Sequence, residues 1–299
     1  MLLDAHFSDP ILQSVKDPFL QAHGLTLKML RLDLVHPLVS GNKWFKLKFN
    51  LAQAFDLGHN SVLSYGGAYS NHLIALAAAA KLNGLRSIGV IRGELIKPLN
   101  PALAFMQDQG MVLHPVSRSD YRHKEDANFK AELLAQYGRF FEVPEGGGNR
   151  LGLLGAAQIS KFIQFTAAST DNYVMLSCGT AATMAGILTS LEGETQVLGV
   201  SVLKGDDTLS GQVHDWLAEQ GQLTPCVWQI LKDFHCGGYA KSTPELRQCM
   251  QEFTQLSGIP LEPVYTAKMI YGFYSLAKEG YFPRGSEIIA IHTGGLVAM

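Results

Sequence analysis

The stretch NYVMLSCGTAATMAGILTSL, residues 172–191, contains the pattern on which the fold prediction rests. Its first part, up to Cys178, is short and apolar and predicts a buried β-strand. Gly179 and the small residues after it predict a tight turn, and the apolar spacing beyond the turn predicts a helix. A strand that passes into a helix through such a turn is typical of parallel α/β proteins.

The same order of strand, turn and helix recurs on both sides of this stretch. Residues 60–67 and 70–84 form one such pair, and residues 195–205 and 208–221 form another. Roughly eight such units are more than one ordinary open sheet holds. The sequence therefore predicts an α/β protein of two domains, each with an open parallel sheet covered by helices on both faces.

The glycine run at residues 146–148 is a plausible crossover between the two domains. We expect residues 1–46 and 146–299 to form the larger domain. Residues 47–145 are then a smaller α/β domain inserted into it. The first 20 residues look like a loosely docked arm.

The composition narrows the class of protein. Of 299 residues, 47% are hydrophobic and 17% are charged, which is a globular balance, and the formal net charge is −2. No broad basic surface is expected, so nucleic acid and anionic membranes are not expected partners. The start of the chain lacks a secretory signal pattern, and the four cysteines lack zinc or disulfide spacing. We expect a cytoplasmic enzyme without a metal site or a membrane span.

Residues 177–186, SCGTAATMAG, are the first candidate ligand-binding loop. Small side chains after a strand let consecutive backbone N–H groups face one anion, and the helix dipole adds to the attraction. The loop lacks the Lys-Ser/Thr of a triphosphate site and is not the GxGxxG of a dinucleotide site. A phosphate site and an ordinary strand-to-helix turn are equally supported by this loop alone.

Two further loops carry candidate groups. In SYGGAYSNH, residues 64–72, Ser70 and Asn71 stand where a helix begins and could bind a carboxylate, although Ser70 is also an ordinary N-cap. In SGNKWFKLK, residues 40–48, Lys43 opens a helix beside apolar residues. A desolvated lysine has a lowered pKa and can form a Schiff base. Lys46 and Lys48 compete for that role, and most lysines only solvate a surface.

Two later segments contain polar groups at element ends. Tyr265 and Thr266 stand at a helix start in EPVYTAKM, residues 262–269, where a threonine is commonly a cap. IHTGG, residues 291–295, predicts a strand that ends in a glycine turn, and His292 in it is more often a satisfied core histidine than an acid or base.

Taken in order, these segments resemble one family. GNK, SxGGxxSNH, GGGN, SCGTAAT, EPVYTxK and HTGG, found between Gly41 and Gly295, are similar to motifs of the pyridoxal-phosphate (PLP) enzymes that include D-cysteine desulfhydrase and 1-aminocyclopropane-1-carboxylate (ACC) deaminase. The resemblance implies the tryptophan synthase β-subunit-like fold, also called fold type II, with PLP as cofactor.

The resemblance also implies the cofactor contacts. Lys43 would form the Schiff base, Asn71 would bond the cofactor 3′-oxygen, and Thr266 would stand at the pyridine nitrogen. The phosphate would be held by the turn that follows the strand at Cys178, which consists of Gly179, Thr180, Ala181, Ala182 and Thr183.

The same resemblance assigns residues that face the substrate. Ser70 would bind the substrate carboxylate or move protons, and Tyr265 would face the substrate. Tyr239, in HCGGYAKSTPE, is a looser match to another active-site tyrosine. Tyr69 stands where these families usually have glutamine, and the chain ends four residues after Gly295, where relatives run on further.

The residue at the position of Thr266 distinguishes activities within the family. Ring-opening deaminases have a glutamate there, which keeps the pyridine nitrogen protonated. A threonine favours β-elimination from D-cysteine or a similar β-substituted amino acid to pyruvate, ammonia and sulfide. ACC deamination and a non-catalytic PLP-binding protein are the alternatives, a nucleotide-dependent α/β enzyme is a further one, and a homodimer is expected.

Overall fold

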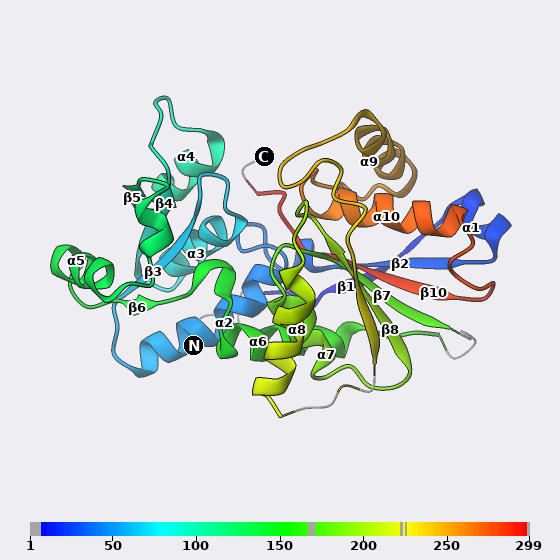
Figure 1. The fold of residues 1–299 in the computed structure, drawn as a ribbon, viewed down its shortest axis with the longest axis horizontal. Helices are drawn as coiled ribbons and strands as arrows, with labels where there is room; N and C mark the ends of the chain where they lie inside the picture. Colours follow the sequence, from blue (N-terminus) through cyan, green and yellow to red (C-terminus); the bar gives the residue numbers. More distant parts are fainter. Residues whose placement is uncertain (1–6, 167–170, 222–223, 225, 298–299) are drawn as a thin grey trace.

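The computed structural model describes residues 7–166, 171–221, 224 and 226–297. Two lobes lie side by side, each built around its own sheet (Figure 1). Helix α2 (Asn42–Asp56) lies between them and packs against helices of both lobes. The fold is therefore α/β with two sheets, as the strand and helix pattern predicts.

The smaller sheet has strand order β5–β4–β3–β6, and all its strands run parallel. Its strands are β3 (Ser61–Gly67), β4 (Arg86–Arg92), β5 (Val112–Val116) and β6 (Phe141–Glu142). Helices α3 (Asn71–Leu82) and α4 (Pro101–Asp108) pack on one face, and α5 (Ala127–Tyr137) packs on the other. Since β3 leads directly into α3, residues 67–71 lie at the carboxyl edge of this sheet.

The larger sheet has strand order β1–β2–β10–β7–β8–β9. It comprises β1 (Ile11–Val15), β2 (Thr26–Arg31), β7 (Asn172–Cys178), β8 (Thr195–Ser201), β9 (Val227–Leu231) and β10 (Glu287–His292). Only β1 runs antiparallel, at the edge beside β2. The strand that comes last, β10, therefore lies inside the sheet between β2 and β7.

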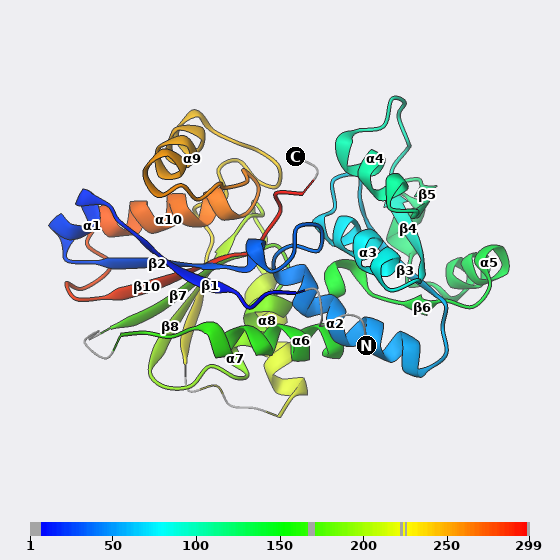
Figure 2. The same cartoon turned by 180° about the vertical axis from the view of Figure 1, so that it is seen from behind.

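Helices cover both faces of the larger sheet. Helices α6 (Arg150–Ala157), α7 (Ala182–Leu188) and α8 (Thr208–Glu219) lie on one face, and α9 (Pro244–Ser257) and α10 (Thr266–Lys278) lie on the other (Figure 2). Gly186 lets α6 and α7 approach closely, because a Cβ there would lie 2.6 Å from Ala156 Cβ. Two apolar layers result, one on each side of the strands.

The prediction of a loose N-terminal arm was wrong for residues 11–20. This segment forms β1 and the start of helix α1 (Pro18–His23), and Asp17 caps the helix by accepting from Phe19 N–H at 2.8 Å. Gly24 ends the helix in the left-handed conformation. In the described part of the chain, every helix is too short or too polar to cross a lipid bilayer.

Candidate active site

The turn before α2 is fixed by the end of strand β10. Gly41 has φ +75°, and a Cβ there would lie 2.0 Å from the carbonyl oxygen of Thr293. The backbone N–H of Asn42 donates to that same oxygen at 3.2 Å. Only glycine fits both the left-handed conformation and this close approach. The GNK and HTGG motifs are therefore in direct contact, and the helix that bears Lys43 begins at a defined place.

The amine of Lys43 is linked to the turn after β7 through a single side chain. Lys43 Nζ donates to Asn42 Oδ1 at 2.9 Å, and Asn42 Nδ2 donates to Thr183 Oγ1 at 2.9 Å. Burial lowers the pKa of Lys43 to about 8, against the opposing effect of the negative charge of Glu262. The candidate amine and the candidate phosphate turn thus face one shared space.

The turn itself has the features of an anion site. Strand β7 ends at Cys178, and α7 begins with Ala181 as N-cap, which offers no side-chain acceptor to the first N–H groups of the helix. Gly179 lies against the Tyr265 ring, since a Cβ there would be 2.8 Å from Tyr265 Cε1. Thr180 is exposed beside Gly146 of the glycine run. Ala182 and Thr183 follow, buried, in the first turn of α7.

The second loop brings Ser70 and Asn71 to the start of α3. Ser70 is the N-cap, and its Oγ accepts from Leu73 N–H at 3.3 Å, so its hydroxyl proton stays available to donate. Gly66 leaves room for this hydroxyl, because a Cβ there would lie 2.5 Å from it. Asn71 reaches across to the larger lobe, where its Nδ2 lies 3.0 Å from the Cβ position of Gly295.

Tyr265 and Thr266 are held at the start of α10 by a buried carboxylate. Glu262 Oε1 accepts from the N–H groups of Tyr265 at 2.7 Å and Thr266 at 2.6 Å, and Oε2 accepts from Val264 N–H at 2.8 Å. Thr266 Oγ1 accepts from Glu262 N–H at 3.0 Å and lies 3.3 Å from Glu262 Oε1. Burial raises the pKa of Glu262, and the backbone hydrogen bonds oppose this.

Tyr239 lies next to Tyr265. Their ring centroids are 6.1 Å apart with an interplanar angle of 74°, an edge-to-face pair. Burial, followed by the neighbouring Tyr239 phenol, raises the pKa of Tyr265 well above its usual value. Tyr239 is 45% exposed and Tyr69 is 66% exposed.

The sequence assigned no contact in the site to two buried residues beside Lys43, although it named Lys46 as a competitor for the Schiff base. Lys46 is buried under Gly147, and burial, with the charge of Lys43 as the second cause, lowers its pKa well below the usual value. His72 is also buried. Its Nε2 lies 2.9 Å from Ser64 Oγ, and its Nδ1 has no hydrogen-bond partner among the described residues. The only sequence signal for Lys46 is its place one helical turn after Lys43.

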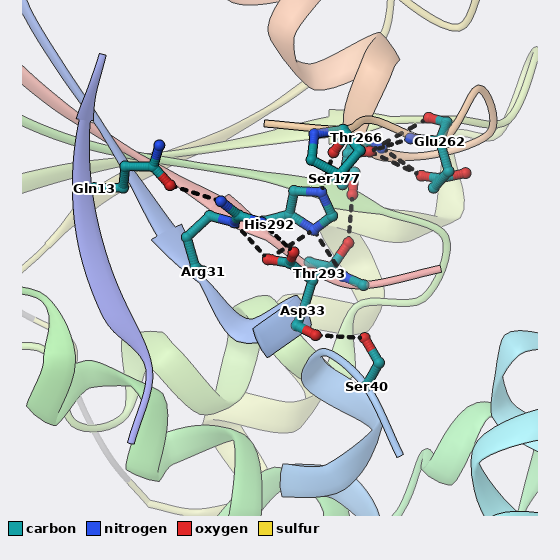
Figure 3. Close-up of polar contacts among 11 residues, drawn as sticks. Gln13, Arg31, Asp33, Ser40, Ser177, Glu262, Thr266, His292 and Thr293 are labelled. Atoms are coloured by element: carbon teal, nitrogen blue, oxygen red, sulfur yellow. Dashed lines mark hydrogen bonds and ion pairs between the residues drawn. The ribbon is translucent and has the colours of Figure 1, made fainter. Parts of the chain in front are cut away.

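A buried polar network lies behind the site (Figure 3). Arg31 pairs with Asp33 through two hydrogen bonds of 2.8 and 2.6 Å. His292 Nε2 donates to Pro260 O at 2.8 Å, and its Nδ1 accepts from Gly294 N–H at 3.2 Å. Burial lowers the pKa of His292, although Asp33 opposes this. As expected, His292 is a satisfied core histidine, and it fixes the glycine turn that Gly41 contacts.

The arrangement can bind an anion and present a partly neutral amine. The anion would meet the N–H groups at the start of α7, and its charge would favour the ammonium form of the buried Lys46 amine. An amine with a pKa of about 8 is a nucleophile near neutral pH. The contacts of Lys43 with Asn42 and of Asn42 with Thr183 bring the GNK motif and the turn after β7 together.

Comparison with known proteins agrees with this geometry. The model of the family described as "Pyridoxal-phosphate dependent enzyme" matches residues 17–294. A protein of Thermotoga maritima named "Putative 1-aminocyclopropane-1-carboxylate deaminase" is 30% identical over 298 residues, which cover 93% of this chain and 91% of that protein. A Pyrococcus horikoshii protein of the same name is 28% identical over 281 residues, covering 91% of this chain and 85% of its own.

Solved structures show the same fold. A crystal structure described as an ACC deaminase homologue has a TM-score of 0.82 and 24% identity, covering 99% of this chain and 94% of the other. A fungal L-serine ammonia-lyase from Rhizomucor miehei has a TM-score of 0.66 and 12% identity, covering 98% of this chain and 95% of its own. At these identities the likeness establishes the fold alone.

Proposed function

The chain belongs to the pyridoxal-phosphate dependent enzymes of fold type II, and we propose that it catalyses β-elimination from D-cysteine or a similar β-substituted amino acid. The products would be pyruvate, ammonia and sulfide. The observation that carries the proposal is the Asn42 side chain, which joins the Lys43 amine to Thr183 in the candidate phosphate turn.

The residues present fit PLP. The α7 turn offers N–H groups without side-chain acceptors, and Lys46 adds a buried amine that lacks a carboxylate partner among the described residues, so a bound anion would favour its charged form. Buried charges are costly unless paired, so an anionic phosphate would supply what Lys46 lacks. In the same region, buried His72 has an Nδ1 atom without a hydrogen-bond partner among the described residues, so a further polar group is needed to complete its hydrogen bonding. We therefore assign the phosphate to residues 179–183 and Lys46.

The other predicted residues then take the following roles. Lys43 holds the cofactor covalently, and its amine, once released, can accept the proton from the substrate Cα. When bound, PLP supplies an electron sink for the negative charge left at that carbon. Ser70 donates its hydroxyl proton to the substrate carboxylate beside the free N–H groups of α3. Asn71 contacts the cofactor from the smaller lobe, and Tyr265 faces the substrate.

Thr266 supports elimination over ring opening. A threonine hydroxyl holds positive charge on a neighbouring ring nitrogen less well than a carboxylate does, and a thiol leaving group needs only a weak electron sink. Two observations support ACC deamination as the second candidate. The carboxylate of Glu262 lies 3.3 Å behind the Thr266 hydroxyl, and the relatives in Thermotoga and Pyrococcus carry the ACC deaminase name.

A panel of amino acids tests the proposal. Purified holoenzyme is incubated with D- and L-cysteine, β-chloro-D-alanine and ACC, and 2-oxo acid, ammonia and sulfide are measured. Pyruvate and sulfide from D-cysteine are the expected result. Formation of 2-oxobutanoate from ACC alone would replace the first candidate by the second. Absence of turnover across the panel, with PLP bound and its absorbance changed by amino acids, would mean a non-catalytic binder.

The lowered pKa of Lys43 predicts how fast the apoprotein takes up PLP at different pH values. Only the neutral amine attacks the aldehyde, so the rate of covalent loading should rise with pH and level off above a midpoint of about 8. Stopped-flow absorbance of the apoprotein mixed with PLP measures this. A rate that climbs steadily to pH 10 would show an ordinary exposed lysine, because an unperturbed amine titrates near about 10.4.

Lys46→Met should weaken PLP binding by about 10- to 100-fold, because a charge-assisted contact to phosphate contributes about 1.5–3 kcal/mol. Equilibrium binding of pyridoxal, which lacks the phosphate, provides the internal control and should be unchanged. If the variant binds PLP and pyridoxal equally weakly, Lys46 supports the site in general and does not contact the phosphate.

A further inference from the structure

The loop of residues 235–241 has an unusual backbone. Cys236 at φ 49° and Ala240 at φ 54° are the two non-glycine residues with positive φ in the part of the chain that the structure describes. Gly237 and Gly238, between them, have φ 96° and 110°. Residues other than glycine rarely adopt a positive φ, and they keep this conformation only where the neighbouring structure imposes it.

A buried lysine of helix α10 contacts this loop. Lys268 is completely buried, and its Nζ donates to the carbonyl oxygen of Gly238 at 2.7 Å and to that of Val202 at 3.5 Å. Val202 directly follows strand β8. No ion pair of Lys268 with a carboxylate is found within the described ranges. Burial lowers its pKa, while Cys236 and Glu262 oppose this.

The loop presents one aromatic side chain to the site. Gly238 directly precedes Tyr239, so the hydrogen bond from Lys268 fixes the peptide plane from which Tyr239 extends. The Tyr239 ring packs edge-to-face on Tyr265, whose own ring lies against Gly179. A chain of contacts thus leads from a buried lysine to the candidate phosphate turn.

We propose that Lys268 is a positioning residue that holds loop 235–241 in its strained form, so that Tyr239 and Tyr265 together form one wall of the substrate pocket. Burying an ammonium whose partners are only carbonyl oxygens costs free energy. A methionine would fill the same space without that cost. The placement of the loop stands on the geometry alone, while the role of the wall in turnover rests on the proposed function.

The placement is tested with Lys268→Met in the holoenzyme. Trypsin cleavage after Lys241 should become at least about 10-fold faster, because a loop that opens locally is cut in proportion to its open population. Absorbance at 295 nm should show that one more tyrosine ionises below about pH 11, because Tyr265 becomes exposed to solvent. Lys204→Met is the matched control, because the Lys204 Cβ lies 3.2 Å from the Cβ position of Gly238 but its amine is exposed.

Two further variants keep the test decisive. Ala240→Gly removes the backbone strain at one position and should restore part of the trypsin resistance in the Lys268→Met background. If Lys268→Met does not fold, Lys268→Gln, which keeps a donor for Gly238, should show intermediate cleavage. Wild-type cleavage and titration in a folded Lys268 variant would overturn the proposal.

The role in turnover is tested with D-cysteine as the probe. Tyr239→Phe and Lys268→Met should each raise KM more than they lower kcat, and the double variant should resemble Tyr239→Phe alone, because both act through one side chain. Additive effects would contradict the proposed wall. If wild-type enzyme does not turn over D-cysteine, the proposed function fails, while the cleavage and titration results still decide the position of the loop.

Discussion

Lys43→Ala is expected to yield folded protein that no longer attaches PLP covalently and whose turnover is lowered by about 10³-fold or more, since both the nucleophile and the proton acceptor are lost. After borohydride treatment of wild-type protein, mass spectrometry should find the cofactor on the peptide containing Lys43. The structure supports this result, because the amine is partly buried, has a pKa of about 8 and is joined to the candidate phosphate turn through Asn42.

Lys48→Ala is the matched control for this variant. Lys48 lies on the same helix, and it was a competitor for the role on sequence alone. Its removal should leave the absorbance of bound PLP and the turnover unchanged. A Lys43→Ala protein with the absorbance of the wild type would show that another amine carries the cofactor, and Lys46 would be the next candidate.

Gly41→Ala is expected to destabilise the protein by more than about 4 kcal/mol or to prevent folding, because two costs combine. Alanine is strained at φ +75°, and its Cβ would lie 2.0 Å from Thr293 O and 2.7 Å from Gly294 Cα. Backbone atoms cannot rotate away as a side chain can. Urea unfolding of the apoprotein, followed by circular dichroism, measures the difference.

Gly58→Ala separates the two costs. Gly58 follows the other end of the same helix at φ +70°, with no atom within 4 Å of a Cβ at that position. It should therefore lose only about 1–2 kcal/mol from the strained backbone. Equal losses for the two variants would mean that the contact between Gly41 and Thr293 relaxes easily, and the fixed start of α2 would then need another cause.

Most of the fold could be predicted from the sequence because parallel α/β units repeat a simple pattern. Buried strands such as β7 are short apolar runs, and glycine turns mark where helices follow. Residues 11–20 were missed for a physical reason. Strand β1 is an edge strand with two exposed residues, two partly buried residues and one buried residue, so its alternation is weak. The helix signals at Asp17, Pro18 and Gly24 were present in the sequence but belong to only two turns.

The site residues also fall into those that could be identified from the sequence and those that could not. Motif residues such as Lys43 and Ser70 could be picked out because they stand at element ends, where function gathers. Their roles stay predictions, as do the domain boundaries at residues 46 and 146. Lys46, His72 and Glu262 matter only through burial and the charges around them, and neither can be read before the chain is folded. Their importance is a property of the packed interface between the lobes.

The position of β10 between β2 and β7 determines when the site is completed during synthesis on the ribosome. The strands of the smaller sheet all lie between residues 61 and 142, so they can pair as soon as that part of the nascent chain has emerged. The larger sheet must wait, because its interior strand spans Glu287–His292. Since Gly41 contacts Thr293, the helix that bears Lys43 cannot reach its final position until that point. A growing polypeptide therefore exposes this amine to cellular aldehydes long before it can hold vitamin B6.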